Sequence, residues 1–325
     1  MLEIILTLVG GLVLFLYAVG NLSETVKEWA GDKARDFIAR FTKNVFTAIV
    51  VGIVVTTVLD SSSAVIILTI VLVNAGTLSF RQAIGIVMGA NIGTTISSQI
   101  IAMDVGKYSP VALIIGLALL IISHNPKINR TGKILLYFGM LFFGLFTMEN
   151  AVEPLKEHPQ FTEWMIGLEN PLYGALIGGL VTVIIQSSSA TVGMVITLAK
   201  QSLITLPAGI AVMLGAELGT CADTLLATVR SNRQALKTGL FHLFFNLITV
   251  TLGLLLFVPF VSLTKQISGD SDIKNQIANA HLLFNVSGVL LLVAFVPLFE
   301  KILNWLLPDA GEEKPVLQEA VQPTI

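Results

Sequence analysis

Long stretches of the chain contain no Asp, Glu, Lys or Arg, and most of them match the length of a membrane-spanning helix. A helix that crosses a bilayer needs about 20 predominantly apolar residues. These stretches are too long and too uniformly apolar for the alternating strands of a membrane barrel. They predict spanning helices at 4–23, 82–103, 108–126, 134–148, 201–216, 238–264 and 275–299. The first has no basic residue before it, so we expect a retained helix rather than a signal peptide.

Two further apolar segments are each interrupted by a polar tetrapeptide. Asp60-Ser61-Ser62-Ser63 divides the segment 44–74, and Gln186-Ser187-Ser188-Ser189 divides the segment 171–199. At about 1.5 Å per residue, each apolar arm is short for a complete crossing. Non-helical backbone inside a bilayer is tolerated only where it is buried in protein or lines a wet cavity. We therefore expect two re-entrant helical hairpins, at about 44–74 and 171–199.

The two interrupted segments belong to an internal repeat with an offset of 126 residues. VLDSSSA at 58–64 aligns with IIQSSSA at 184–190, and GANIGTT at 89–95 aligns with GAELGTC at 215–221. Each copy has an odd number of crossings, so the second copy must be inverted relative to the first.

The predicted fold is therefore an all-α polytopic membrane protein of two inverted-topology repeats, each with a re-entrant helical hairpin and three spanning helices. The repeats cover residues 1–125 and 132–260. An extra C-terminal transmembrane helix at 275–305 has no counterpart in the repeat and is expected to be an appendage. Residues 308–325 are expected to form a disordered cytoplasmic tail.

Composition and charge agree with a membrane protein. Charged residues make up 12% of the chain and hydrophobic residues 54%, whereas roughly a quarter of the residues in soluble domains are charged. The net charge of −2 argues against nucleic acid as a partner. The single cysteine, Cys221, excludes a disulfide framework within the chain.

The basic residues predict an orientation. All 19 fall outside the expected spans, and 14 of them lie on one side, in loops 21–43, 124–133 and 230–237, at Arg81 and after Phe299. That side should be cytoplasmic, which puts the N-terminus outside and the C-terminus in the cytoplasm. The segment 21–43 is expected to be an amphipathic helix lying on the cytoplasmic surface.

The serine triplets and three intramembrane acids are the candidate chemistry. A hairpin tip exposes the N-terminus of its second arm, where free N–H groups and the helix dipole favour an anion. The hydroxyls of Ser61–Ser63 and Ser187–Ser189 can donate to anionic oxygens or coordinate a small cation. No Lys or Arg lies in the apolar stretches, so we expect helix ends and co-bound cations to balance the anion.

Acids inside a membrane are functional candidates by default. The oxygen ligands suited to Na⁺ or a proton are those of Asp60, Glu217 and Asp223, together with Ser63 and Ser189. Purely structural interpretations stay open: the serines can bond only to nearby carbonyls, and Glu217 and Asp223 can be uncharged packing residues. The glycine pairs of the two GA motifs are expected to allow close helix packing, and His281 to be a hydrogen-bonded interior residue.

The paired motifs resemble those of the sodium/phosphate cotransporter family, which includes the type II sodium-phosphate cotransporters and shorter bacterial relatives. The resemblance covers about residues 1–260 and implies Na⁺-driven symport of inorganic phosphate across a plasma or bacterial inner membrane, with no organic cofactor. Carried over by position, it implies phosphate and sodium sites at Gln186, Ser187, Ser188 and Ser189 and at Ser61, Ser62 and Ser63, with Asn91, Thr94, Thr95 and Thr220 on supporting helices.

The chain departs from the family pattern at two positions. Asp60 stands where the family usually has Gln, and Glu217 where Asn is usual. Each adds a negative charge unless it is protonated, which leaves open the cation count, the ionisation state of phosphate and the identity of the substrate.

We therefore predict a Na⁺-coupled phosphate symporter, not an enzyme, that works in a lipid bilayer by alternating access about a midplane site. A homodimer is compatible with the sequence. Two alternatives stay open: Na⁺- or H⁺-coupled transport of another oxyanion or small carboxylate, and a membrane protein that senses phosphate without moving it.

Overall fold

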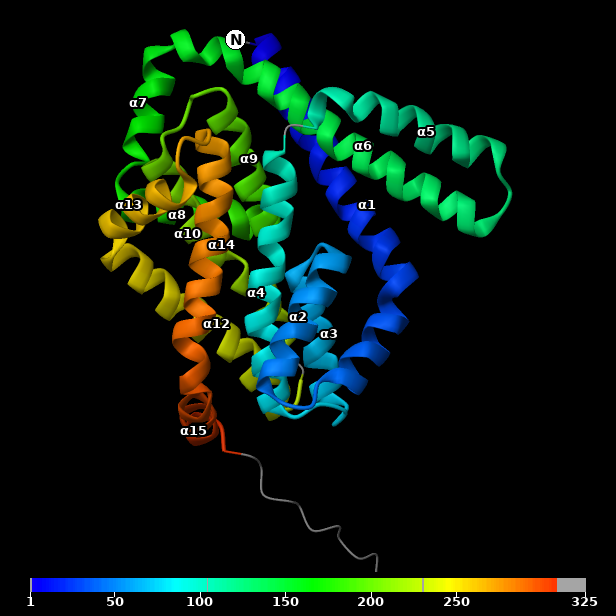
Figure 1. Ribbon diagram of the computed structural model, residues 1–325, viewed down its shortest axis with the longest axis vertical. Coiled ribbons are helices and arrows are strands. Elements are labelled where there is room, and N and C mark those ends of the chain that lie inside the picture. The colour runs from blue at the N-terminus through cyan, green and yellow to red at the C-terminus, as the bar shows by residue number, and fades with distance from the viewer. Residues whose placement is uncertain (1, 104, 230, 309–325) are drawn as a thin grey trace, which may run out of the picture.

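The computed structural model describes residues 2–103, 105–229 and 231–308, and within them all the regular structure is helical (Figure 1). The helices of the first half are α1 (Leu2–Phe41), α2 (Val45–Leu59), α3 (Ser62–Asn74), α4 (Phe80–Ala102), η1 (Gly106–Tyr108), α5 (Ser109–Ile122), α6 (Pro126–Val152), η2 (Glu153–Glu157) and α7 (Pro159–Gly167). Those of the second half are α8 (Pro171–Ile185), α9 (Ser188–Lys200), α10 (Leu206–Gly219), α11 (Cys221–Ala227), α12 (Arg233–Leu255), α13 (Phe257–Ser268), α14 (Ile273–Leu292), η3 (Val293–Phe295) and α15 (Val296–Leu306).

Six helical segments of the described chain are long and apolar enough to cross a membrane. They are Leu2–Phe41, Phe80–Ala102, Pro126–Glu157, Leu206–Ala227, Arg233–Leu255 and Ile273–Leu306. Helices α7 and α8 meet at a bend of 101° and would add a seventh segment if they form one span. The chain is therefore an all-α integral membrane protein, although the expected span 108–126 is reduced to the 14-residue α5.

Helix α1 is longer than the sequence predicted. It runs for 40 residues without interruption, so the expectation of a separate surface helix at 21–43 is wrong. In Figure 1, α1 bends below its middle and returns toward the lower ends of α2 and α3. Its second half buries Ala30, Ala34 and Ile38 against α2. This apolar face packs on α2, and residues 21–41 continue α1 instead of forming a helix of their own.

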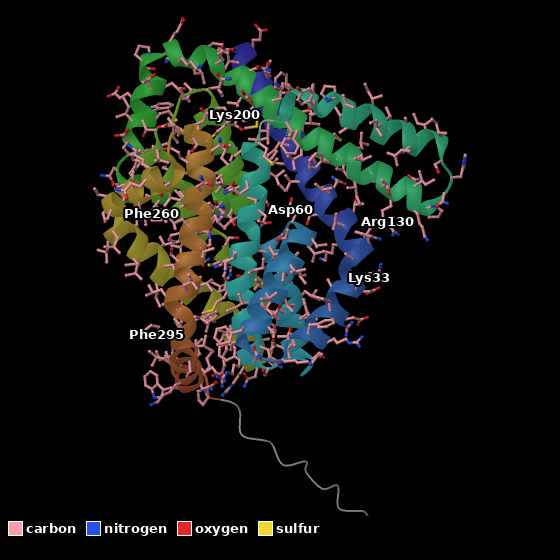
Figure 2. The ribbon with its side chains drawn as sticks, in the orientation of Figure 1. Lys33, Asp60, Arg130, Lys200, Phe260 and Phe295 are labelled. Atoms are coloured by element: carbon pink, nitrogen blue, oxygen red, sulfur yellow. The ribbon has the colours of Figure 1, made fainter. Side chains whose placement is uncertain are left out.

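Two helix–break–helix units occupy the segments predicted as hairpins. The first unit is α2 and α3, and the second is α8 and α9; each break is only two residues long. The segments that flank the first unit are joined where the Gln82 side chain, in α4, donates a hydrogen bond to the Thr42 carbonyl, before α2. The segments that flank the second unit are joined by a bond of 2.8 Å from the hydroxyl of Thr205, the N-cap of α10, to the carboxylate of Glu169, before α8. Asp60, at the first break, lies near the centre of the molecule (Figure 2).

Matched glycine contacts pack each unit onto the long helix that follows it. A Cβ on Gly89 would collide with the Ile49 carbonyl oxygen, and a Cβ on Gly215 with the Ala175 carbonyl oxygen. Both residues of the second contact lie 126 positions after those of the first. Small residues of this kind let helix backbones approach closely in membranes. The packing role expected for these glycines is confirmed.

Helix α14 lies at the centre of the fold, so its description as an appendage is wrong. It packs against α4, α9 and α10 and buries Ala278, His281 and Asn285 between them. Helix α5, by contrast, packs mainly against α6, and this pair extends away from the rest of the molecule (Figure 1). Helix α12, at the matching position of the second copy, packs against α3, α4 and α10 instead. The correspondence between the two copies therefore does not extend to their last helices.

Lys237 is buried in the first turns of α12, although it was expected in the loop 230–237. Lys237 is 0% exposed and donates a hydrogen bond of 2.6 Å to the Asn304 side chain. The difference arises because α12 begins at Arg233, after an Asn232 cap. The start of α1 and helix α15 lie at opposite ends of the molecule (Figure 1). The expected tail lies outside the described residues, apart from Pro308.

Candidate functional site

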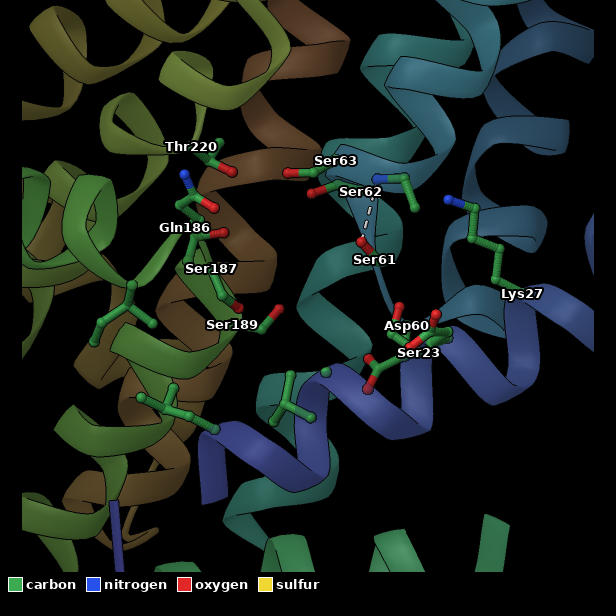
Figure 3. A pocket seen from close by; sticks show the side chains of 17 residues that line it. Ser23, Lys27, Asp60, Ser61, Ser62, Ser63, Gln186, Ser187, Ser189 and Thr220 are labelled. Atoms are coloured by element: carbon green, nitrogen blue, oxygen red, sulfur yellow. Dashed lines mark hydrogen bonds between the residues drawn. The ribbon is translucent and has the colours of Figure 1, made fainter. Parts of the chain in front are cut away.

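A cavity of about 450 Å³ lies where the two helix breaks face each other. Its 17 lining residues come from α1, from the two breaks, and from Thr220 between α10 and α11 (Figure 3). All six serines of the two triplets line it, together with Asp60 and Gln186. Residues that are 126 positions apart in the sequence therefore meet in one site.

The two breaks have nearly the same backbone conformation. Asp60 has φ 51° and ψ 33°, and Gln186 has φ 59° and ψ 29°, both in the left-handed region. This region costs a non-glycine residue about 1–2 kcal/mol. Ser61 and Ser187 follow in extended conformation and cap the next helix, each Oγ accepting a bond of 3.2 Å from the N–H three residues on. The turn places the N-termini of α3 and α9 at the cavity wall.

The hydroxyl groups of the cavity differ in what they can still bind. Ser62 and Ser188 are buried in the first turns of α3 and α9, whereas Ser63 and Ser189 project into the space between the breaks (Figure 3). Thr220 is only 4% exposed, and its hydroxyl has no hydrogen-bond partner among the described residues. Buried polar groups normally have a partner, so a ligand or water in this cavity would satisfy Thr220.

The three acids predicted as cation ligands do not lie together. Asp60 lines the cavity, and its carboxylate accepts a hydrogen bond from Ser97. Asp223, three residues after Thr220, does not line the cavity, and its carboxylate accepts a bond of 2.6 Å from the backbone N–H of Thr224. Glu217 does not line the cavity. No cluster of three or more His, Cys, Asp or Glu side chains suited to a metal ion occurs in the part of the chain that the structure describes.

Glu217 belongs to a buried polar network that joins three helices. Its Oε1 lies 2.6 Å from Nε2 of His281 and accepts a bond of 3.1 Å from the amide of Asn285. The other ring nitrogen of His281 lies 2.7 Å from the Ser98 hydroxyl. Ser98 is in α4, Glu217 in α10 and His281 in α14, so the network connects both sequence copies to the C-terminal helix. The expected role of His281 as a hydrogen-bonded interior residue is confirmed.

The residues expected on supporting helices lie behind the cavity, with Thr220 as the exception. Asn91, Thr94 and Thr95 are buried in α4 and do not line it. The amide of Asn91 donates a bond of 2.7 Å to the side chain of Asn246 in α12. The two threonine hydroxyls bond to carbonyls of their own helix at 2.9 and 2.7 Å. These side chains hold α4 in place rather than face the cavity.

One wall of the cavity comes from α1, which the sequence analysis did not connect with the site. Gly20, Ser23, Glu24 and Lys27 line it. They stand at positions i, i+3, i+4 and i+7 and so share one helix face, a signal that becomes visible once α1 is treated as continuous. Lys27 supplies a positive charge where the sequence predicted none.

Comparison with known proteins identifies the family. The sequence profile of the Na⁺/Pi-cotransporter family matches residues 14–150 and 159–270. The chain is 30% identical over 298 residues to the uncharacterized protein YqeW of Bacillus subtilis, a match that covers 91% of this chain and 96% of YqeW. No solved structure matches it.

Two further relatives have names that mention phosphate. The putative inorganic phosphate export protein YjbB of Escherichia coli is 24% identical over 311 residues, which are 95% of this chain but 56% of YjbB. The chain therefore spans about half the length of YjbB. The human sodium-dependent phosphate transport protein 2B is 33% identical over 130 residues, which are 37% of this chain and 19% of that protein. The profile match includes both serine triplets and both glycine motifs, so the resemblance is confirmed and the chain belongs to the Na⁺/Pi-cotransporter family.

Proposed function

We propose that the chain is a secondary active transporter that moves inorganic phosphate together with Na⁺ by alternating access. The observation that carries this proposal is the cavity in which two serine triplets, each at the start of a helix, face each other. Membership of the family supports phosphate as the transported anion. The name of the human relative, which mentions sodium dependence, supports Na⁺ as the coupling ion.

The cavity offers donors for a tetrahedral oxyanion. Helices α3 and α9 each have 13 residues, and a helix N-terminus carries about half a positive charge and free N–H groups. In this proposal the phosphate oxygens accept hydrogen bonds from Ser63, Ser189, Thr220 and the Gln186 amide. The other serines of the triplets hold the two helix starts in position.

Bound Na⁺ would balance the remaining negative charge. The cavity lining carries Asp60 and Glu24 against the single base Lys27, and phosphate adds at least one more negative charge. We assign Asp60, Asp223, Ser63 and Ser189 as Na⁺ ligands. Glu217 is left out of this set because it is 3% exposed and its Oε1 is already held by His281 and Asn285. Coupling then follows because each bound cation raises the affinity for the anion.

Alternating access would use two inverted repeats with re-entrant hairpins. Three features support this part of the proposal: the matching dihedrals at the breaks, the matched glycine contacts, and the course of α3 and α9 from the cavity toward opposite ends of the molecule (Figure 1). Inverted repeats allow one site to open to either side by exchanging the conformations of the two halves. We retain the predicted orientation with a cytoplasmic C-terminus.

Export of phosphate is a second candidate function. YjbB, which matches 95% of this chain, is named as a putative exporter of inorganic phosphate. An inward Na⁺ gradient drives a symporter inward. Export through the same cavity would therefore need a phosphate gradient alone or exchange for another ion.

The experiment that tests the proposal is uptake of ³²P-phosphate by purified protein in liposomes. We expect an inward Na⁺ gradient to accelerate uptake above that in an equal K⁺ gradient, and excess unlabelled phosphate to compete more strongly than sulfate or succinate. Stronger competition by sulfate or succinate would point to another substrate. Binding of phosphate without any flux would favour a sensor, and efflux independent of Na⁺ would favour the exporter.

A further inference from the structure

The cavity holds a single fixed positive charge. Among the lining residues, all of which are described by the structure, Lys27 is the only base, and Glu24 and Asp60 are the acids. Lys27 is in the second half of α1, seven residues after Gly20 on the same side of the helix. Figure 3 shows its amine turned toward the Ser61–Ser63 break.

Lys27 also lines a second cavity, which runs along α1. The α1 wall of this cavity contains Lys27, Gly31 and Arg35, spaced by four residues on one helix face, together with the acids Glu24, Glu28 and Asp32. The opposite wall is formed by Leu68 and Val71 of α3 together with their neighbours. The two cavities share Glu24, Lys27 and Ala64. Lys27 therefore stands at their junction.

From this position we propose that Lys27 is an anion-binding residue of the transporter. It receives the phosphate oxyanion at the junction of the two cavities and holds it while the serine hydroxyls replace its hydration shell. The inference rests on the proposed function, because it names a residue through which that function gains affinity for its substrate.

Simple electrostatics supports this role over that of a solvated helix residue. Without Lys27 the lining of the first cavity would carry only the two acids, and an arriving oxyanion would meet negative charge before it reached the helix ends. A lysine ammonium on its flexible stem is a strongly hydrated point charge with three donors. It can follow the anion over several ångströms without a change in the backbone.

Lys33 provides a matched control on the same helix. It carries the same charge, but its amine lies 5.5 Å from the ring of Trp29, and the cavity that it lines contains Val54 and Val58 rather than the serine breaks. Replacing either lysine by Gln removes one positive charge from the exposed side of α1. Only the substitution of Lys27 would remove a positive charge from the proposed path of the anion.

The first test measures the apparent KM for phosphate in liposomes that contain the full chain. We expect Lys27→Gln to raise it about 3- to 10-fold, Lys27→Glu to raise it further, and Lys27→Arg and Lys33→Gln to stay within about twofold of the wild type. The maximal rate and the Na⁺ activation curve should change little. A wild-type KM in Lys27→Gln, or an equal rise in Lys33→Gln, would overturn the assignment.

The second test restores the charge chemically. Cys221 is the only cysteine of the chain and is 1% exposed, so Lys27→Cys introduces a single accessible thiol. Modification with an aminoethyl methanethiosulfonate should restore the low KM, whereas the sulfonatoethyl reagent should raise it, and phosphate should slow both reactions. Equal effects of the two reagents would overturn the role of charge. If the wild type moves no phosphate, the proposed function fails; if the wild type transports but these variants behave like it, only the role of Lys27 fails.

Discussion

The buried pair of Glu217 and His281 leads to a prediction about stability that is asymmetric between its two partners. The side chains of Glu217 and His281 are 4% and 0% exposed, and their closest atoms are 2.6 Å apart. The prediction tests whether they act as a buried charge pair. Replacing His281 by Gln leaves the carboxylate in the interior with the amide of Asn285 as its remaining charge-stabilising donor. Replacing Glu217 by Gln leaves a neutral amide of nearly the same shape beside the His281 ring.

The expected magnitudes follow from burial. Removing one partner of a buried ion pair costs about 3–5 kcal/mol when the other charge is left behind, so His281→Gln should lower the free energy of unfolding by that amount. Glu217→Gln should cost less, because the Gln amide can still donate to or accept from the neighbouring ring nitrogen of His281. The double variant should recover most of the loss of His281→Gln, since no uncompensated charge remains.

Thermal unfolding in detergent, followed by tryptophan fluorescence, ranks the wild type, the two single variants and the double variant by stability. Asp272→Asn is a surface control: Asp272 is 76% exposed and 3.9 Å from Lys274, so its loss should change stability by about 1 kcal/mol or less. If the two single variants were equally destabilised and the double variant showed the sum of both losses, the two side chains would not act as a charge pair.

Three further predictions concern packing and the cavity. Gly215→Ala should destabilise the protein by about 1–3 kcal/mol, because the new Cβ would collide with the Ala175 carbonyl oxygen. Gly10→Ala is the control, since a Cβ at that position meets nothing within 4 Å, and equal melting temperatures for the two variants would contradict the packing. Asp60→Asn should shift the Na⁺ activation curve of uptake several-fold, and unchanged dependence on both Na⁺ and pH would exclude Asp60 as a cation or proton site. Thr220→Val should raise the KM for phosphate about 3- to 10-fold, which is the effect of one lost hydrogen bond. The melting temperature should not fall, because the Thr220 hydroxyl has no partner in the described residues. An unchanged KM would show that Thr220 does not contact the substrate.

The helix breaks could be predicted from the sequence because few structures accommodate a polar tetrapeptide within an apolar run. Asp60 and Gln186 stand at the same point of both copies, and the structure ends a helix immediately before each of them. The close glycine contacts could also be predicted, because small residues at matched positions of membrane helices commonly allow two helix backbones to pack closely.

The course of α1 and the partner of Glu217 could not be predicted from patterns along the chain. The charged residues after Ser23 indicate that the chain enters a more polar environment. Charged residues do not by themselves end a helix, and with no proline or cap at this point α1 continues to Phe41. His281 lies 64 residues after Glu217, and their contact depends on how α14 sits against α10. That register is set by packing across the whole interior, so neither residue carries a local signal for the other.

The most direct test of the central claim is to locate the bound anion. Crystals grown in Na⁺ and arsenate, a tetrahedral oxyanion, would give an anomalous difference map at the arsenic absorption edge. The account predicts one strong peak in the cavity, between Ser63, Ser189 and Thr220. A peak elsewhere, or none in this cavity at an arsenate concentration that fully inhibits phosphate flux, would contradict it.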